Sequence, residues 1–455
     1  MIAITGVGMA TAQGDAERVR GDHAPFAAEP LPWPVRRSAA ARTFRPARGV
    51  RGVGLERMIA LAEQALAECP RAAGEPLVLA SCNGGATTFE RDDWRRGFEL
   101  GRALGTDSPV ASAACASGIH ALYLARTLVE AGAPSALVLA VDIATQPSHD
   151  NFESLRIVAD EVAPYQPEAA GFTVGEAAVC VRLARGSRGV PITGPVLGQD
   201  LNDDDALHRV LAALPPFDAD LVLGQATGPA HADRAELGAI ATRVTADVAL
   251  ASASHHFGHA LGASSLLAVA LAARARETIP RALALPHARA ADGRSLVTGS
   301  VRATQVLVAC RALGGACATC VVGTAGDVAP VSRQWRSASA PPPLRHLFLR
   351  DLARAAFEHR PAEPPALLVV TLEAPLQPPD DAWVGTRLLP SSVLELTPGF
   401  VTQLVARSWG FAGPAVTLVG GDPGPILAAC RRTHDRVYHL AIRGMDHHRD
   451  AEWNR

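Results

Sequence analysis

The chain has 455 residues, of which 48% are hydrophobic and 19% are charged, and its formal net charge is −2. This much apolar side chain supports packed cores in more than one lobe and argues against a disordered chain. A net charge this small provides no field that attracts nucleic acid or an anionic membrane, so neither is expected as a partner. No uncharged run of apolar residues is long enough to predict a membrane-spanning helix. The opening residues predict a strand rather than a signal peptide.

Two features of the composition restrict the chemistry further. Lysine is missing, so all 43 Lys+Arg residues are arginine, which excludes Schiff-base chemistry, a catalytic lysine and a P-loop lysine. The eight cysteines are scattered and lie mostly in apolar runs. Without an export signal, they predict free thiols in a reducing, cytoplasmic location.

Residues 1–185 alternate strand-like apolar runs with helical patterns. We expect strands at 2–5, 76–81, 135–141 and 177–183, and helices at 54–69 and 116–131. Residues 186–330 show the same alternation. We expect strands at 220–226, 248–254, 304–312 and 316–322 and a helix at about 260–276. Continuous apolar runs suit strands buried on both faces, and their alternation with helices predicts a layered α/β fold.

A linker and a third segment follow residue 330. Residues 331–344 are rich in Ser, Ala and Pro, which predicts a linker. In residues 345–455 we expect helices at 345–357 and 398–409 and strands at 366–373, 415–420 and 437–442.

The sharpest motif is PVASAACASGIHALYLARTLVEAG at 109–132, where a strand of small residues leads to Cys115 and a long apolar helix follows. This places a thiol at a helix N-terminus, where free amides and the helix dipole favour a thiolate and predict a lowered pKa. The alternative interpretation is a buried structural cysteine, which is the fate of most cysteines.

The segment ACASG around Cys115 resembles the nucleophile turn of β-ketoacyl synthases, a branch of the thiolase superfamily. Four more stretches resemble that family in the same order, within about residues 1–325: IAITGVGMATAQG (2–14), AGFTVGEAAVCVRL (170–183), GHALGAS (258–264) and ALGGACAT (312–319). The resemblance implies a thiolase-like layered α-β-α-β-α fold of two related lobes. The N-terminal lobe, 1–185, would carry the nucleophile, and 186–330 would form the C-terminal lobe.

The predicted site departs from the family pattern. In GQATGPAHADRAE (224–236) the family's supporting positions are kept, but glutamine stands where the first histidine is usual. Serine replaces the family's lysine, and leucine replaces its phenylalanine gate. The resemblance implies a catalytic set of Cys115, Gln225 and His259, and a hole for the oxyanion made by the amides of Cys115 and the Gly314–Gly315 loop. The other residues it implies are the gate, Leu313, and the supporting Thr227, Gly228, Asp233, Glu236 and Ser254.

The C-terminal segment resembles part of a second N-terminal lobe. Residues 395–432 are similar to the region that leads into a ketosynthase nucleophile turn, and aligning Pro109 with Pro414 places Gly420 opposite Cys115. Residues 345–455 thus resemble a degenerate half-lobe without a nucleophile; the alternative is a generic α/β segment. Ketosynthases dimerise through this half, which implies a homodimer or a heterodimer with a ketosynthase-like subunit.

The implied function is acyl transfer or condensation through an acyl-Cys intermediate, in polyketide or specialised fatty-acid biosynthesis. The substrates would be thioesters of acyl carrier protein or CoA. Their phosphopantetheine arm belongs to the substrate, so the protein would need no cofactor or metal of its own. Glutamine can donate to an enolate oxygen but cannot shuttle a proton, so slow decarboxylation is expected.

Two alternatives stay open. The first is an acyltransferase, cyclase or hydrolase that never decarboxylates. The second is a non-catalytic, chain-length-factor-like partner of another ketosynthase. The presence of both Cys115 and His259 argues against the second.

Overall fold

The computed structural model describes residues 1–15, 19, 27–33, 43–82, 84–85, 97–186, 188–201, 205–276, 283–299, 302–328, 347–375, 383–384, 387–388, 397–443 and 450–454. The predicted linker at 331–344 lies outside these residues. Among the helices described, none is long and apolar enough to cross a membrane.

The first lobe is built on five neighbouring strands. They are β1 (Ile2–Thr11), β5 (Leu77–Ala80), β6 (Val110–Ala111), β7 (Ser135–Asp142) and β8 (Ala177–Arg185). Their order across the sheet is β1-β8-β7-β5-β6. The pairings β1–β8 and β8–β7 are antiparallel, whereas β7–β5 and β5–β6 are parallel.

The second lobe repeats this topology strand for strand. Its order is β9-β13-β12-β10-β11, with two antiparallel pairings followed by two parallel ones. The two lobes join where β1 pairs with β9. The predicted pair of related lobes is therefore confirmed. The strands of the second lobe are β9 (Val190–Gln199), β10 (Leu221–Leu223), β11 (Ala249–Ala251), β12 (Val306–Arg311) and β13 (Ala316–Val322).

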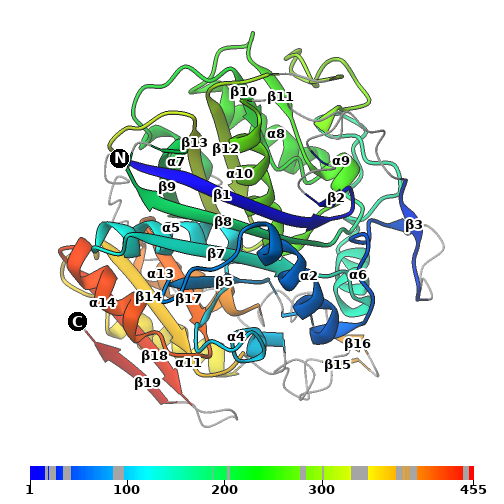
Figure 1. The fold of residues 1–455 in the computed structure, drawn as a ribbon. Helices are drawn as coiled ribbons and strands as arrows, with labels where there is room; N and C mark the ends of the chain where they lie inside the picture. Colours follow the sequence, from blue (N-terminus) through cyan, green and yellow to red (C-terminus); the bar gives the residue numbers. More distant parts are fainter. Residues whose placement is uncertain are drawn as a thin grey trace.

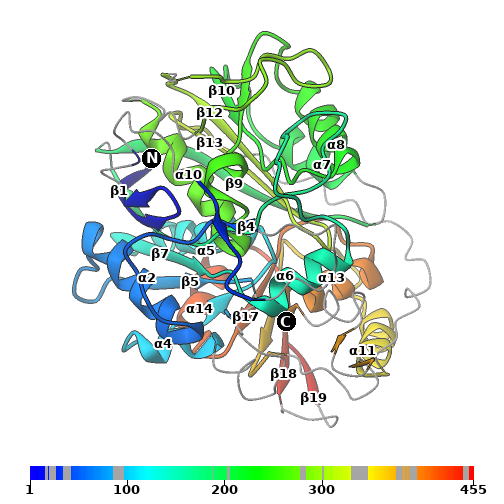
Figure 2. The same cartoon turned by 90° about the vertical axis from the view of Figure 1, so that its right-hand side faces the viewer.

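Helices and sheets alternate in layers (Figures 1 and 2). Helices α5 (Ser117–Glu130) and α10 (Ser264–Arg274) share one hydrophobic core with strands of both lobes. They touch so closely that a Cβ on Gly118 would collide with Leu266. Helix α2 (Gly54–Glu68) has its own core on the first lobe, and α7 (Ala206–Ala212) and α8 (Ala230–Ala241) have theirs on the second. This is the predicted α-β-α-β-α arrangement.

The described C-terminal segment repeats the later part of the first lobe. Its strand order, β17-β14-β18-β19, has two parallel pairings and then an antiparallel one. The order β6-β5-β7-β8 in the first lobe has the same pattern. The elements are α11 (Leu347–Glu358), β14 (Leu367–Leu372), α13 (Pro398–Trp409), β17 (Ala415–Val419), α14 (Gly424–Thr433), β18 (Val437–Arg443) and β19 (Asp450–Asn454).

This segment extends the sheet of the first lobe. Strand β17 pairs antiparallel with β6, with Leu418 opposite Ala111 and Val419 opposite Val110. The Ser112 N–H also donates to the Thr417 carbonyl, 3.1 Å away. The edge of β6, the strand that leads to Cys115, is thus covered by β17 of the C-terminal segment.

Shorter elements complete the described structure. They are β2 (Gly14–Asp15), β3 (Glu29–Pro30), β4 (Thr43–Phe44), α4 (Leu100–Ala103), α6 (Gln146–Ser154), α9 (Ser254–Phe257), β15 (Trp383–Val384), β16 (Arg387–Leu388) and the 3₁₀ turns Gly97–Glu99 and Leu261–Ala263.

Candidate active site

Cys115 lies in the turn between β6 and α5 and is buried. The preceding Ala114 has a φ of +49°, a left-handed conformation that is strained for a residue with a Cβ. Ser117 holds the turn, because its Oγ accepts from the Ala113 N–H at 2.9 Å and donates to the Ala114 carbonyl at 2.6 Å. The sulfur is therefore fixed just before the first turn of α5.

His259 contacts the thiol of Cys115 directly. Its Nε2 lies 2.9 Å from the sulfur of Cys115, although the two residues are 144 positions apart in the sequence. Residues 170–183, one of the stretches that resemble the family, hold the backbone of His259 in place. The His259 N–H donates to the Thr173 carbonyl at 2.8 Å, and the Gly175 N–H donates to the His259 carbonyl at 3.0 Å.

Two contacts to the imidazole were not predicted from the sequence. The Ser264 hydroxyl lies 3.3 Å from Nδ1 of His259, and the Phe172 ring packs against the imidazole with centroids 4.6 Å apart. Both residues fall inside motifs that were recognised, but only the folded chain brings them to the histidine.

A buried carboxylate shapes the backbone at Gln225. The N–H groups of Gln225 and Ala226 both donate to Glu236, at 2.8 and 2.9 Å. Asp233 accepts from the Gly228 N–H at 3.0 Å and so holds the next turn. Burial raises the pKa of Glu236 to about 7. The two acids on α8 thus support the loop rather than face the sulfur.

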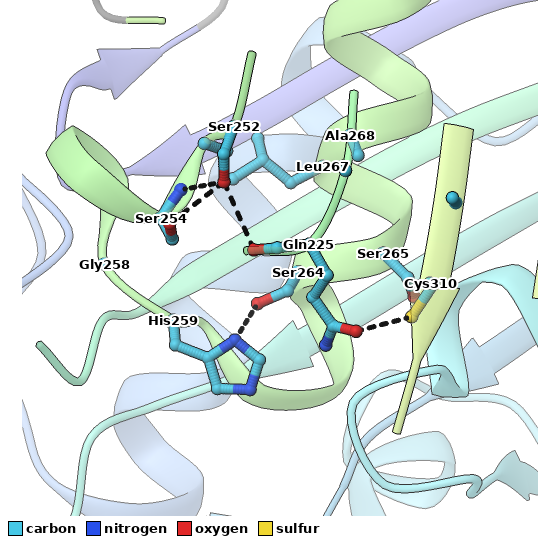
Figure 3. A pocket seen from close by; sticks show the side chains of 13 residues that line it. Gln225, Ser252, Ser254, Gly258, His259, Ser264, Ser265, Leu267, Ala268 and Cys310 are labelled. Atoms are coloured by element: carbon cyan, nitrogen blue, oxygen red, sulfur yellow. Dashed lines mark hydrogen bonds between the residues drawn. The ribbon is translucent and has the colours of Figure 1, made fainter. Parts of the chain in front are cut away.

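The side chain of Gln225 is oriented by its oxygen. Its Oε1 accepts from the Arg311 backbone N–H at 2.8 Å and lies 3.4 Å from the Cys310 sulfur. Its Nε2 is buried and has no hydrogen-bond partner among the described residues. Figure 3 shows the amide nitrogen on the side of the His259 ring and the oxygen toward Cys310. The amide therefore offers an unused N–H donor beside the imidazole.

Backbone strain collects around these three side chains. In the part of the chain that the structure describes, five residues other than glycine have positive φ. Three of the five adjoin the site: Ala114 before Cys115, Ala226 after Gln225, and Leu261 two residues after His259. Such conformations persist only where the surrounding structure enforces them, and they cluster at functional sites.

The loop between β12 and β13 supplies an amide to the sulfur, but not the predicted one. The backbone N–H of Leu313 hydrogen-bonds to Cys115. The Gly315 N–H is used inside the loop, where it donates to the Ala312 carbonyl at 3.0 Å. Gly314 and Gly315 both have a φ of +98°, so their role is to form the turn. The loop amide that reaches the sulfur is thus that of Leu313, the oxyanion hole of Cys115 and the Gly314–Gly315 loop stays a prediction, and Leu313 is 37% exposed.

The predicted lowering of the Cys115 pKa is wrong for the unliganded site. Burial raises the pKa of Cys115 to about 12, although backbone hydrogen bonds oppose the shift. Burial also lowers the pKa of His259 to about 4. Removing charge from water outweighs the helix dipole here. The pair at rest is a neutral thiol facing a neutral imidazole.

A pocket adjoins Gln225 and His259, lined partly by small side chains. Ser254, at the position of the family's lysine, bonds the Ser252 hydroxyl at 2.9 Å and the Ala226 carbonyl at 3.1 Å. Thr227 lies half-buried in the same loop as Gln225. The serine hydroxyls and alanine methyl groups thus form part of the pocket wall beside the amide.

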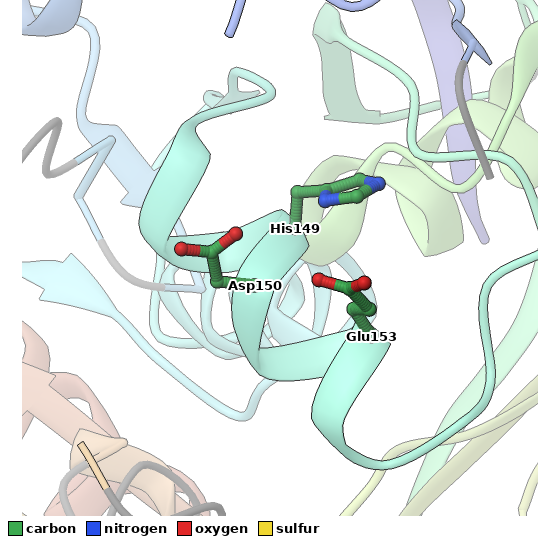
Figure 4. Close-up of side chains that lie close together, drawn as sticks. All are labelled: His149, Asp150 and Glu153. Atoms are coloured by element: carbon green, nitrogen blue, oxygen red, sulfur yellow. The ribbon is translucent and has the colours of Figure 1, made fainter. Parts of the chain in front are cut away.

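One group of possible metal ligands lies elsewhere. Among the described residues it consists of His149, Asp150 and Glu153, all on α6 (Figure 4). Their ligand atoms lie within 4.8 Å of one another. Because a single helix supplies all three, we assign no metal to them.

The close approach of Gly175 to α9 provides a test of how His259 is held. A Cβ at Gly175 would overlap the Phe257 carbonyl oxygen, whereas a Cβ at the exposed helical Gly238 would meet nothing. We expect Gly175→Ala to lower the free energy of unfolding by about 1–3 kcal/mol, and Gly238→Ala to leave it unchanged or raise it. Denaturant unfolding of both variants measures this, and equal stabilities would show that Gly175 is not tightly packed.

Comparison with known proteins gives a partial sequence match and extensive structural matches. Residues 104–188 match the family model of the beta-ketoacyl synthase, N-terminal domain. No curated protein sequence matches the chain. A solved structure of the ishigamide ketosynthase/chain length factor is similar at 16% identity and a TM-score of 0.61, over 71% of this chain and 99% of that one.

Two further structures extend the likeness. The PfaC keto synthase-chain length factor is similar at 14% identity and a TM-score of 0.70, over 97% of this chain and 73% of that one. A type II PKS acyl-carrier protein–ketosynthase complex, AntDE:AntF, is similar at 15% identity and a TM-score of 0.57, over 71% of this chain and 99% of that one. The chain therefore has the thiolase-like fold of ketosynthases and chain length factors, and its match to the β-ketoacyl synthase N-terminal domain is confined to residues 104–188.

Proposed function

We propose that this protein is a ketosynthase-like acyltransferase or condensing enzyme that carries an acyl group on Cys115. The observation that supports this most is the 2.9 Å contact between the Cys115 sulfur and Nε2 of His259. A nucleophile within hydrogen-bond reach of a base, with the base oriented by a third group, is the arrangement that covalent catalysis requires. Ser264 is that third group.

The neutral pair suggests the order of proton movements. As the sulfur attacks a thioester carbonyl, its proton passes to Nε2 of His259, which is free to accept because its pKa is about 4. The carbonyl oxygen becomes an oxyanion, which the amides of Cys115 and Leu313 stabilise. When the tetrahedral intermediate collapses, the bond to the departing sulfur breaks and that thiolate takes the proton from His259. A new thioester at Cys115 results.

The proposed substrates are phosphopantetheine thioesters on an acyl carrier protein, in polyketide or specialised fatty-acid biosynthesis. The similar structures support this setting by name: one is a complex of a ketosynthase with its acyl-carrier protein. We place the activity in the cytoplasm, where the eight buried free cysteines would stay reduced.

A second candidate function is supported by the names of the similar structures. Two of them contain a chain length factor, and a non-catalytic partner of another ketosynthase would need no acyl-cysteine. Against this role stand the contact between Cys115 and His259 and the strained backbone that holds both residues.

Acylation of Cys115 separates the two candidates. We expect incubation with an acyl thioester, either a carrier-bound chain or a short pantetheine analogue, to add the acyl mass to the peptide that contains Cys115. Peptide mass spectrometry measures it, and Cys115→Ala is the control that should gain no mass. Two outcomes would exclude the enzymatic proposal and favour the partner role: the wild-type protein stays unmodified, or the Cys115→Ala variant gains as much mass as the wild-type protein does.

A further inference from the structure

The C-terminal segment reaches the active-site loop through one helix. Helix α13 packs beside β17, the strand that covers the edge of β6. At its start, Gly399 lies so close to Ser112 and Ala113 that an added Cβ would be 2.8 Å from their backbone atoms. The N-terminal end of α13 therefore contacts the backbone shortly before Cys115.

Two polar side chains further along α13 meet the loop between β12 and β13. Arg407 donates from Nε to the Asp200 carbonyl at 3.1 Å and from Nη2 to the Gly314 carbonyl at 3.4 Å. The Gln403 amide is packed against Gly314 and Gly315, where an added Cβ would collide with it. Gln403 is 2% exposed, and its Nε2 has no partner among the described residues.

The loop they contact is the one that presents an amide to the nucleophile. Its two glycines have positive φ and no side chains to pack, so the loop contributes little rigidity of its own. Asp200 ties it to β9, because the Asp200 N–H donates to the Gly315 carbonyl at 2.9 Å. Arg407 thus braces both the loop and the residue that anchors it.

We propose that Arg407 and Gln403, which lie outside both lobes, are positioning residues that hold the Leu313 amide toward Cys115. The inference rests on the proposed acyl transfer and assigns the C-terminal segment a part in it: the segment completes the oxyanion hole from the side. A hole donor contributes fully only when fixed at the position that the oxyanion will take, and a displacement of about 1 Å can lower a rate about 100-fold.

Two reactions of the same sulfur test this in the full-length protein. Acylation by an acyl thioester builds an oxyanion, whereas alkylation by iodoacetamide displaces iodide and builds none. We expect Arg407→Ala to lower the single-turnover acylation rate at least tenfold and the alkylation rate less than threefold. Gln403→Leu, which keeps the volume, should show the same selectivity to a smaller extent. Arg407→Lys, which still reaches one carbonyl, should recover part of the loss.

The matched control is Arg431→Ala, an exposed arginine on α14 of the same segment, which should leave both rates unchanged. Thermal melting of each variant shows whether it is folded. If Arg407→Ala does not fold, Gln403→Leu provides the test. Unchanged acylation in the folded variants, or equal losses in both reactions, would overturn the positioning role. A wild-type protein that is never acylated would instead defeat the proposed function, and this inference with it.

Discussion

Replacing His259 by alanine should lower the rate of Cys115 acylation by about 10²–10⁴-fold, the usual contribution of a positioned general base. Its imidazole is the group that accepts the thiol proton, because Nε2 lies 2.9 Å from the sulfur. The need for a base is strong here, since burial raises the Cys115 pKa to about 12 and leaves almost no thiolate at neutral pH. Single-turnover acylation, followed by mass spectrometry, measures the loss.

A neighbouring histidine provides the control for this substitution. His256→Asn changes a half-buried imidazole three positions away and should alter the rate by less than twofold. The pH profile of the wild-type protein tests the assignment independently. His259 acts in its neutral form and its pKa is about 4, so acylation should stay level from pH 8 to about pH 5.5 and fall only as the pH nears 4. A fall centred on pH 6.5, the ordinary histidine value, would show either that burial does not lower the pKa of His259 or that another base accepts the proton.

The sequence predicted the residues of the site better than their ionisation. Cys115 and His259 meet as expected because each lies in a short motif whose local geometry, a turn into a helix or a tight loop, is encoded nearby. The expected strands and helices match for the same reason, since long apolar runs mark buried elements. Strand β9 was not recognised, because the prolines and glycines in VPITGPVLGQ interrupt its apolar pattern.

What the sequence could not provide depends on contacts between distant segments. The pKa of Cys115 is set by complete burial under both lobes, which no property of residues 109–132 reveals. The amide that reaches the sulfur is that of Leu313, whereas the Gly315 N–H is used inside the hairpin, where it donates to the Ala312 carbonyl. The role of α13 likewise becomes visible only when its side chains meet a loop about 90 residues earlier, as in the Arg407–Gly314 contact.

Decarboxylation is where Gln225 should matter most. Removing CO₂ from a malonyl thioester builds negative charge on the thioester oxygen, and each donor aimed there contributes about 10²–10³ in rate. Gln225 has its Oε1 held by the Arg311 N–H and so can offer only the Nε2 N–H, a neutral donor without a titratable proton. An imidazole that shares a proton makes a stronger, charge-assisted bond. We therefore expect wild-type protein to acylate Cys115 but to release CO₂ from a malonyl carrier slowly.

Two substitutions of Gln225 decide whether its amide is a weak or a competent donor to the enolate oxygen. Gln225→His should raise CO₂ release about tenfold or more, because an imidazole can make the charge-assisted bond that the amide cannot, and the neighbouring pocket residues Ser252, Ala253 and Ser254 have small side chains. Gln225→Leu, which keeps the volume and removes the donor, should lower release below the wild-type rate. Acylation of Cys115 should change less than about threefold in both, since neither touches the sulfur–imidazole contact, and it reports whether the site is still assembled. Rapid CO₂ release by the wild-type protein that disappears in Gln225→His would contradict the prediction and identify the glutamine amide as a sufficient enolate donor.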